Sequence, residues 1–150
     1  MTWEDLGAAV EDLARQIEEA GFRPDAVLAL ARGGLPAAGA LAYALGVKNM
    51  ATLNVEFYTG VEERLEEPLL LPPVPDLTLL RSERLLVVDD VADTGRTLKL
   101  AREFCAEQGP EVKTAVLYEK PQSVVNCDFV WRRTDKWINF PWSSRSPAVA

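Results

Sequence analysis

Two hydrophobic patterns alternate along this chain, one typical of buried strands and one typical of amphipathic helices. Short segments rich in apolar residues, uninterrupted at residues 85–88, predict strands at residues 25–31, 51–57, 85–88, 111–118 and 127–131. Apolar positions three or four residues apart predict helices at residues 2–21, 37–45 and 98–109. Because strands and helices alternate, we expect one α/β domain over residues 1–150, with a mainly parallel twisted sheet and helices on both faces.

The segment at residues 58–83 breaks this alternation. It has no sustained periodicity, contains Pro68, Pro72, Pro73 and Pro75, and is acidic around residues 62–67. A connection of this length in a compact domain is unusual unless it is functional. Two interpretations are open: a functional loop, or a surface excursion with a short hairpin.

Composition excludes several classes of function. The chain has 16 basic and 23 acidic residues and a net charge of −7, which argues against general nucleic-acid binding. We expect no membrane span and no signal sequence, and therefore a cytoplasmic protein. Cys105 and Cys127 lack metal-ligand spacing and are expected to be reduced thiols in or near the core. Without any His, the chemistry cannot use imidazole.

Three carboxylates, Asp89, Asp90 and Asp93, follow the strand at residues 85–88 within five positions. The motif Thr94-Gly95-Arg96-Thr97 then leads into a helix. Such a turn lies at the carboxyl edge of the sheet, where open α/β sheets bind ligands. Backbone amides at a helix start favour a phosphate, and Gly95 allows close approach. Because carboxylates repel phosphate, we expect Asp89 and Asp90 to hold sugar hydroxyls, a divalent cation or both.

Other protein classes use parts of this motif. Asp-Thr-Gly marks aspartic proteases, but those are all-β, whereas residues 98–109 are predicted to be helical. Phospho-receiver domains carry paired acids, but near the start of the chain and with a second acceptor Asp after a later strand. A purely structural capped turn would explain Asp93 or Thr94, but not three acids together.

The stretch at residues 85–98 resembles the phosphoribosyl pyrophosphate (PRPP) motif of type I phosphoribosyltransferases. It matches that motif at all of the motif's polar positions. The resemblance implies that Asp89 and Asp90 orient the ribose diol, directly or through Mg²⁺. It implies that Asp93 is the general base at the purine N7, and that residues 94–97 hold the 5′-phosphate.

The same resemblance gives meaning to Arg32-Gly33-Gly34, which follows the first predicted strand. Alone, two glycines after a strand indicate a tight turn. In the family this position is a pyrophosphate loop, where the glycines admit the phosphate and Arg32 offers a forked contact. The resemblance also implies a cis peptide bond between Ala31 and Arg32.

Near the C-terminus the resemblance narrows to short xanthine-guanine phosphoribosyltransferases. It implies a small hood formed largely by residues 120–145, with Lys120 on the purine 6-oxo group, Trp137 stacked on the ring, and the Ile138 backbone at C2. Asn139 leaves the preference among guanine, xanthine and hypoxanthine open. The alternatives are that the tryptophans close a core edge or form an interface, and that Lys120 is a solvated surface charge.

The implied activity is transfer of the phosphoribosyl group of PRPP to a 6-oxopurine, with pyrophosphate and a nucleoside monophosphate as products. The resemblance further implies Mg²⁺, a homodimer or homotetramer, and a mobile loop from residues 58–83 that closes over the substrate. Two other functions are open: a nucleotide-sensing regulator that keeps the fold without catalysis, and a phosphoribosyltransferase for a different base.

Overall fold

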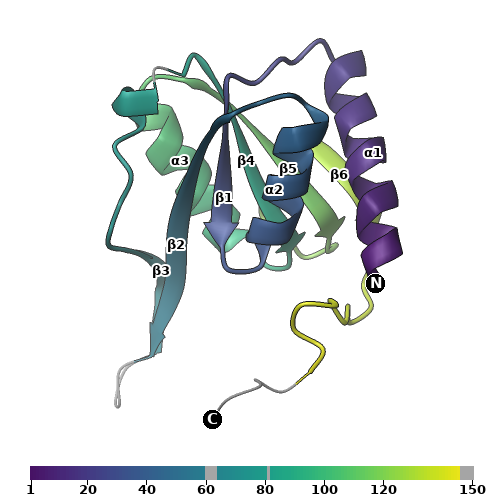
Figure 1. Ribbon diagram of the computed structural model, residues 1–150. Coiled ribbons are helices and arrows are strands. Elements are labelled where there is room, and N and C mark those ends of the chain that lie inside the picture. The colour runs from purple at the N-terminus through teal and green to yellow at the C-terminus, as the bar shows by residue number, and fades with distance from the viewer. Residues whose placement is uncertain (60–63, 81, 146–150) are drawn as a thin grey trace.

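A six-stranded sheet forms the centre of the computed structural model, which describes residues 1–59, 64–80 and 82–145 (Figure 1). The strands are β1 (Ala26–Ala31), β2 (Asn49–Thr59), β3 (Arg64–Leu71), β4 (Arg84–Ala92), β5 (Glu111–Glu119) and β6 (Phe129–Arg133). The helices are α1 (Trp3–Glu19), α2 (Gly34–Ala44) and α3 (Arg96–Glu107), with a 3-10 turn η1 (Leu77–Leu80). The strand order is β3-β2-β1-β4-β5-β6, and only the β2–β3 pair is antiparallel among the described strands.

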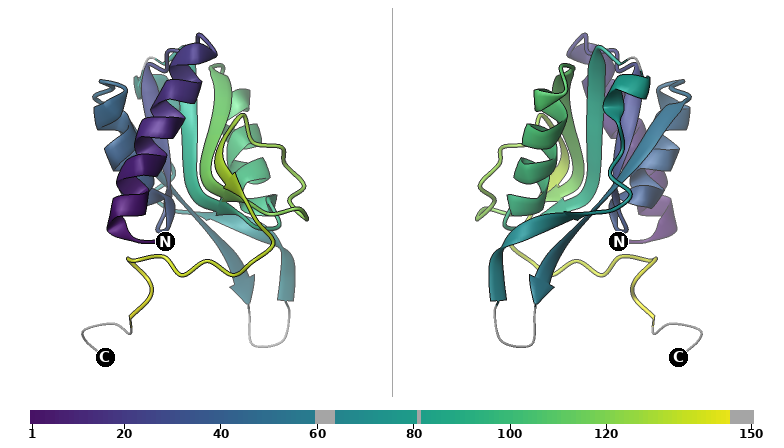
Figure 2. Two further views of the ribbon diagram at one scale, coloured as in Figure 1. Left: turned by 90° about the vertical axis from the view of Figure 1, so that its right-hand side faces the viewer. Right: turned by 90° about the vertical axis from the view of Figure 1, so that its left-hand side faces the viewer.

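Helices cover both faces of the sheet, as predicted (Figure 2). Successive side chains of a strand point to opposite faces, so β4 contributes to two cores. Leu86 and Val88 pack with α1 and α2, whereas Leu85 and Val87 pack with α3. This two-sided burial explains why the central strands are continuous apolar runs.

The long connection contains a strand. β3 pairs antiparallel with β2, with Pro68 opposite Phe57. The described part of the segment therefore contains a hairpin, which by itself does not decide between the two interpretations. Proline made a strand unexpected, but β3 is an edge strand, and proline is tolerated there because one side of the strand needs no ladder hydrogen bonds. Residues 60–63 and 81 lie outside the described residues, so loop closure stays a prediction.

Element boundaries differ from the sequence prediction mainly where glycine and acidic residues occur. α2 begins at Gly34 and α3 at Arg96, each a few residues earlier than expected. β4 continues to Ala92, beyond the apolar run. At α1 the Thr2–Asp5 capping box is present, and the two cysteines are buried and free, as expected. Within the described residues, no helix has the length and apolar character needed to cross a bilayer.

The carboxyl ends of β1, β4 and β5 meet at one edge of the sheet (Figure 1). The C-terminal segment (residues 134–145) passes this edge, and β2 and β3 extend beyond it in both views of Figure 2. Segments from the whole length of the chain therefore surround the edge where the sequence places its candidate site.

Candidate active site

Asp89 and Asp90 lie on β4 itself, not in the turn after it as the sequence predicted. Pairing with β5 continues to Ala92 and keeps this stretch extended. Because the strand alternates, the two carboxylates have different neighbours: Asp89 lines a pocket beside the start of α3, whereas Asp90 lies against Gly33. The Asp90 backbone N–H also donates to Asp89 Oδ1 at 2.8 Å.

The glycine loop (residues 32–34) packs directly on these acids. A Cβ on Gly33 would overlap the Asp90 carboxylate. A Cβ on Gly34 would come within 2.5 Å of the Val88 carbonyl oxygen and 3.0 Å of Asp89 Cα. Only glycine permits this approach, so the β1–α2 loop and the acidic end of β4 form one surface. The family resemblance implied that these two motifs belong to one site, and the structure brings them together.

Both acids have raised pKa values. Burial raises the pKa of Asp89 well above its usual range, and the neighbouring Asp90 charge raises it further. Burial also raises the pKa of Asp90, against hydrogen bonds to its carboxylate, including one from the Trp142 side chain, that lower it. Two crowded carboxylates of this kind favour a shared proton or a cation.

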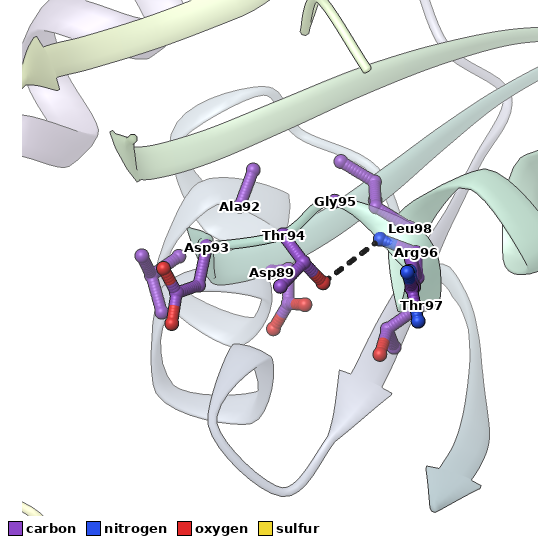
Figure 3. A pocket seen from close by; sticks show the side chains of 9 residues that line it. Asp89, Ala92, Asp93, Thr94, Gly95, Arg96, Thr97 and Leu98 are labelled. Carbon is purple, nitrogen blue, oxygen red and sulfur yellow. Dashed lines mark hydrogen bonds between the residues drawn. The ribbon is translucent and has the colours of Figure 1, made fainter. Parts of the chain in front are cut away.

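The phosphate loop (residues 93–97) joins β4 to α3 and lines a pocket of about 250 Å³ (Figure 3). Gly95 has a φ of +75°, the left-handed conformation that favours glycine, and directly precedes α3. Thr94 Oγ1 accepts a hydrogen bond from the Arg96 N–H at 3.4 Å, and the first turn of α3 contains no acidic residue. A helix start without acidic residues favours an anion, because the helix dipole places partial positive charge there.

Asp93 is exposed at the beginning of this loop. In Figure 3, Asp93, Asp89 and the start of α3 border the same pocket. Asp93 Oδ1 accepts a 2.6 Å hydrogen bond from Nε2 of Gln122, a residue in the turn after β5. Sequence analysis did not identify Gln122, because nothing in the motif indicates which distant side chain reaches this carboxylate.

Arg32 is exposed at the end of β1, and the Ala31–Arg32 peptide bond is cis. The cis bond implied by the family resemblance is thus confirmed. Arg32 stands at the same edge as the phosphate loop, next to the glycines that contact the acids.

Of the expected purine-binding residues, Lys120 is buried at the end of β5, and its Nζ donates to the Lys136 carbonyl. It is therefore not the solvated surface charge of the alternative interpretation. Trp137 is 85% exposed, and its Nε1 donates to Asn139 Oδ1 at 3.2 Å. Ile138 packs at the border of the core.

The expected purine-binding residues line two pockets of the described part of the chain. Trp137 and Ile138 line a pocket of about 380 Å³, whereas Lys120 lines a different pocket of about 270 Å³. The Lys120–Lys136 hydrogen bond connects the end of β5 to the C-terminal segment that carries Trp137 and Ile138.

Trp131 and Trp142 close the edge of the core, as the alternative interpretation held. Trp131 packs edge-on against Tyr118, and Trp142 stacks on Phe140 with ring centroids 4.9 Å apart. Trp142 also reaches the Asp90 carboxylate, a contact that sequence analysis missed.

Comparison with known proteins agrees with this geometry. Residues 2–147 match the family model of the phosphoribosyl transferase domain. The chain belongs to the phosphoribosyl transferase family. A xanthine-guanine phosphoribosyltransferase from Idiomarina loihiensis is 34% identical over 146 residues, covering 95% of this chain and 84% of that protein.

Solved structures of phosphoribosyl transferases and related proteins share the fold. A purine phosphoribosyltransferase from Pyrococcus horikoshii superposes with a TM-score of 0.80 at 34% identity, covering 100% of this chain and 95% of its own. A protein from Neisseria gonorrhoeae solved with bound ppGpp superposes with a TM-score of 0.80 at 27% identity. The match covers 95% of this chain and 86% of that protein's chain.

Proposed function

We propose that this phosphoribosyl transferase moves the 5-phosphoribosyl group of PRPP to a 6-oxopurine and releases pyrophosphate. One observation supports this above the others: the glycine loop lies against Asp89 and Asp90, next to the phosphate loop. The sites proposed for a pyrophosphate, a ribose diol and a 5′-phosphate are therefore adjacent, in the order in which these groups occur in PRPP. The relatives named above carry purine and xanthine-guanine activities in their names.

In the reaction, the purine N9 attacks C1 of the ribose while the bond from C1 to the pyrophosphate oxygen breaks. The sugar develops oxocarbenium character, as in glycoside hydrolysis. Asp93 accepts the proton that leaves N7, so the purine becomes neutral as the new bond forms. The exposure of the Asp93 carboxylate at the start of the phosphate loop supports this role.

The backbone holds much of the PRPP. Amides at the start of α3 bind the 5′-phosphate, helped by the helix dipole. On the other side, Arg32 and the glycine loop bind the pyrophosphate, where a guanidinium can make two parallel hydrogen bonds. These contacts provide local positive potential in a chain whose net charge is −7.

The residues present fit Mg²⁺. Asp89 and Asp90 supply oxygen ligands, and their crowding favours a cation over two bare charges. Within the described residues no cluster of three or more potential metal ligands occurs, and Mg²⁺ is commonly held by one or two carboxylates with water and substrate oxygens. When bound, the ion would neutralise charge on the departing pyrophosphate.

Lys120 and Trp137 are the proposed purine contacts. An ammonium has three donors, so the bond from Lys120 to Lys136 leaves two for the 6-oxo group of a purine. The exposed ring of Trp137 offers a stacking surface, and the backbone of the adjacent Ile138 is assigned to the C2 position. Because the 6-amino group of adenine is itself a donor, Lys120 should discriminate against adenine.

The test is an assay of PRPP consumption with each purine and pyrimidine base in the presence of Mg²⁺. We expect turnover with guanine, xanthine or hypoxanthine and little with adenine or pyrimidines. Adenine used as well as guanine would contradict the 6-oxopurine assignment, and pyrimidine turnover would favour a different base. Turnover should be abolished when Mg²⁺ is left out of the assay and a chelator is added.

A second candidate is a nucleotide-binding regulator without catalysis, because the Neisseria neighbour was solved with ppGpp. Both candidates predict binding of a phosphorylated ribose at this site, but only the transferase predicts product. Calorimetric binding of ppGpp without transfer to any base would favour the regulator. Competition between ppGpp and PRPP in an active enzyme would favour a regulated transferase.

We also propose a homodimer or homotetramer in the cytoplasm. α2 contains no charged residue and leaves Leu35 and Tyr43 exposed, at 42% and 93%. A helix that is apolar all round is usually buried, which supports an assembly on this face. Light scattering after size-exclusion chromatography measures the mass directly, and charge introduced by Tyr43→Glu should reduce it.

A further inference from the structure

We propose that Gln122 is a positioning residue for the candidate general base Asp93. Its Nε2 donates to Asp93 Oδ1 at 2.6 Å, across 29 positions of sequence. Hydrogen bonds to an ionised acceptor are shorter and stronger than neutral ones. The bond uses one carboxylate oxygen and no hydrogen bond to Oδ2 occurs among the described residues, so Oδ2 remains for the purine.

Gln122 can act in this way because its own backbone is held. It belongs to the turn at residues 120–125, in which the Ser123 N–H donates to the Lys120 carbonyl at 3.0 Å. The Val124 N–H donates to the Thr94 carbonyl at 2.9 Å, which ties this turn to the phosphate loop. A Cβ on Gly95 would overlap Ser123 Oγ, so the two segments are in direct contact.

The same turn begins with Lys120, whose N–H donates to the Ala92 carbonyl at 3.0 Å. The residue proposed to read the purine 6-oxo group and the residue that holds the N7 base are therefore two positions apart. We infer that Gln122 keeps the Asp93 carboxylate in register with a purine bound by Lys120. This inference rests on the proposed transferase function.

The experiment compares steady-state kinetics of the full chain and three variants with guanine and PRPP. Gln122→Met keeps the side-chain length but removes the donor, and Gln122→Glu places a like charge against Asp93. Gln16→Met is the matched control, because Gln16 Nε2 also donates a hydrogen bond, to the Val130 carbonyl at 3.2 Å, but between α1 and β6.

We expect kcat to fall about tenfold in Gln122→Met, as for loss of one hydrogen bond to a charged group, and further in Gln122→Glu. KM for PRPP and Tm should stay unchanged, because Gln122 is exposed and its hydrogen bond goes to Asp93, which is not among the proposed PRPP ligands. Gln16→Met should retain the kcat of the unmodified protein.

Three outcomes would contradict this role. Unchanged kcat in Gln122→Met, with an active unmodified protein, would overturn the inference alone. A parallel loss of kcat, PRPP affinity and Tm in Gln122→Met would show that Gln122 supports the fold and does not specifically position Asp93. Absence of transfer by the unmodified protein would instead overturn the proposed function, and with it a catalytic use of Asp93.

Discussion

In the proposed site, backbone groups of two loops form the PRPP side, whereas side chains of Lys120 and of an irregular C-terminal segment form the purine side. On the PRPP side, the glycine loop and the phosphate loop are each fixed between a strand and a helix. Their close contacts leave no room for a Cβ at Gly33, Gly34 or Gly95. On the purine side, residues 134–142 contain no helix or strand, and Trp137 is almost fully exposed.

This difference shows which part of the site is preorganised. The phosphate loop is held by β4, α3 and the turn after β5, so its amides keep their positions without a ligand. The purine side depends on few contacts, among them the hydrogen bond from Lys120 to Lys136. Substitutions should therefore separate two phenotypes: loss of chemistry or PRPP binding on one side, and loss of purine affinity on the other.

The largest effect is expected at the residue between the two sides. Asp93→Asn keeps size and hydrogen bonding but removes the base, so kcat should fall by about 10²- to 10⁴-fold. PRPP affinity measured by calorimetry should survive, because the proposed 5′-phosphate contacts come from residues 94–97 and not from the Asp93 carboxylate. In Asp89→Asn and Asp90→Asn, by contrast, affinity for PRPP and Mg²⁺ should fall. Near-normal turnover of Asp93→Asn would assign the N7 proton to another group or to water.

A second substitution tests the preorganised side through its backbone. In Gly34→Ala the new Cβ meets the Val88 carbonyl at 2.5 Å and must displace main chain. Overpacking of this kind costs about 1 to 3 kcal/mol, and a displacement of about 1 Å can cost about 10²-fold in activity. We expect such a loss in kcat/KM for PRPP, with the fold retained by circular dichroism.

The control for this loop is Gly39→Ala in the same helix. No atom lies within 4 Å of a Cβ at Gly39, so alanine should stabilise α2 by about 0.5 to 1 kcal/mol. Its transfer kinetics should match the unmodified protein. Equal PRPP kinetics for Gly34→Ala and Gly39→Ala would remove the glycine loop from the site.

The same contrast explains what the sequence could predict. Alternating apolar runs and helical spacing were sufficient for the sheet and both helical layers, because burial on two faces leaves a direct hydrophobic signal. The phosphate loop was expected from the residues themselves, because Gly95 follows a buried strand and precedes a helix, whereas the glycine loop was given a role only by the resemblance to the family. Asp89 and Asp90 were misplaced in a turn, because polar residues at the end of a buried strand resemble a loop.

Contacts between distant side chains left no such signal. Three contacts depend on tertiary packing: that of Gln122 with Asp93, that of Lys120 with the Lys136 carbonyl, and that of Trp142 with Asp90. β3 was also missed as a definite strand, because its proline contradicts local strand preference and only its place at the sheet edge makes it acceptable.

A smaller effect is expected on the purine side. Trp137→Ala should raise KM for the purine about tenfold, since stacking on an aromatic side chain contributes about 1 to 3 kcal/mol. Tm and PRPP affinity should not change, because the side chain is 85% exposed. Trp131→Ala is the comparison, since Trp131 packs on Tyr118 and should lower Tm instead. An unchanged KM for the purine in Trp137→Ala would show that Trp137 does not stack on the purine, and another stacking partner would then be required.

The smallest effect concerns the support beneath Lys120. Burial alone raises the pKa of the adjacent Glu119, but hydrogen bonds from the Cys127 N–H at 2.7 Å and Arg133 Nε at 2.8 Å hold it below its usual value. Because the folded pKa is depressed, the carboxylate stabilises the fold fully above the unfolded value, about 4.3. This contribution is lost as the pH falls through the lower folded pKa.

Glu119→Gln keeps an acceptor for Cys127 but loses the charge facing Arg133. Its Tm should therefore lie a few degrees below that of the unmodified protein at pH 7, as for one hydrogen bond to a charged group. The difference should shrink as the pH is lowered past 4, since the native carboxylate then takes up a proton. Differential scanning calorimetry of both proteins from pH 7 to pH 3 measures this. A Tm difference that persists unchanged at pH 3 would show that the carboxylate's charge does not stabilise this turn, and that shape alone supports Lys120.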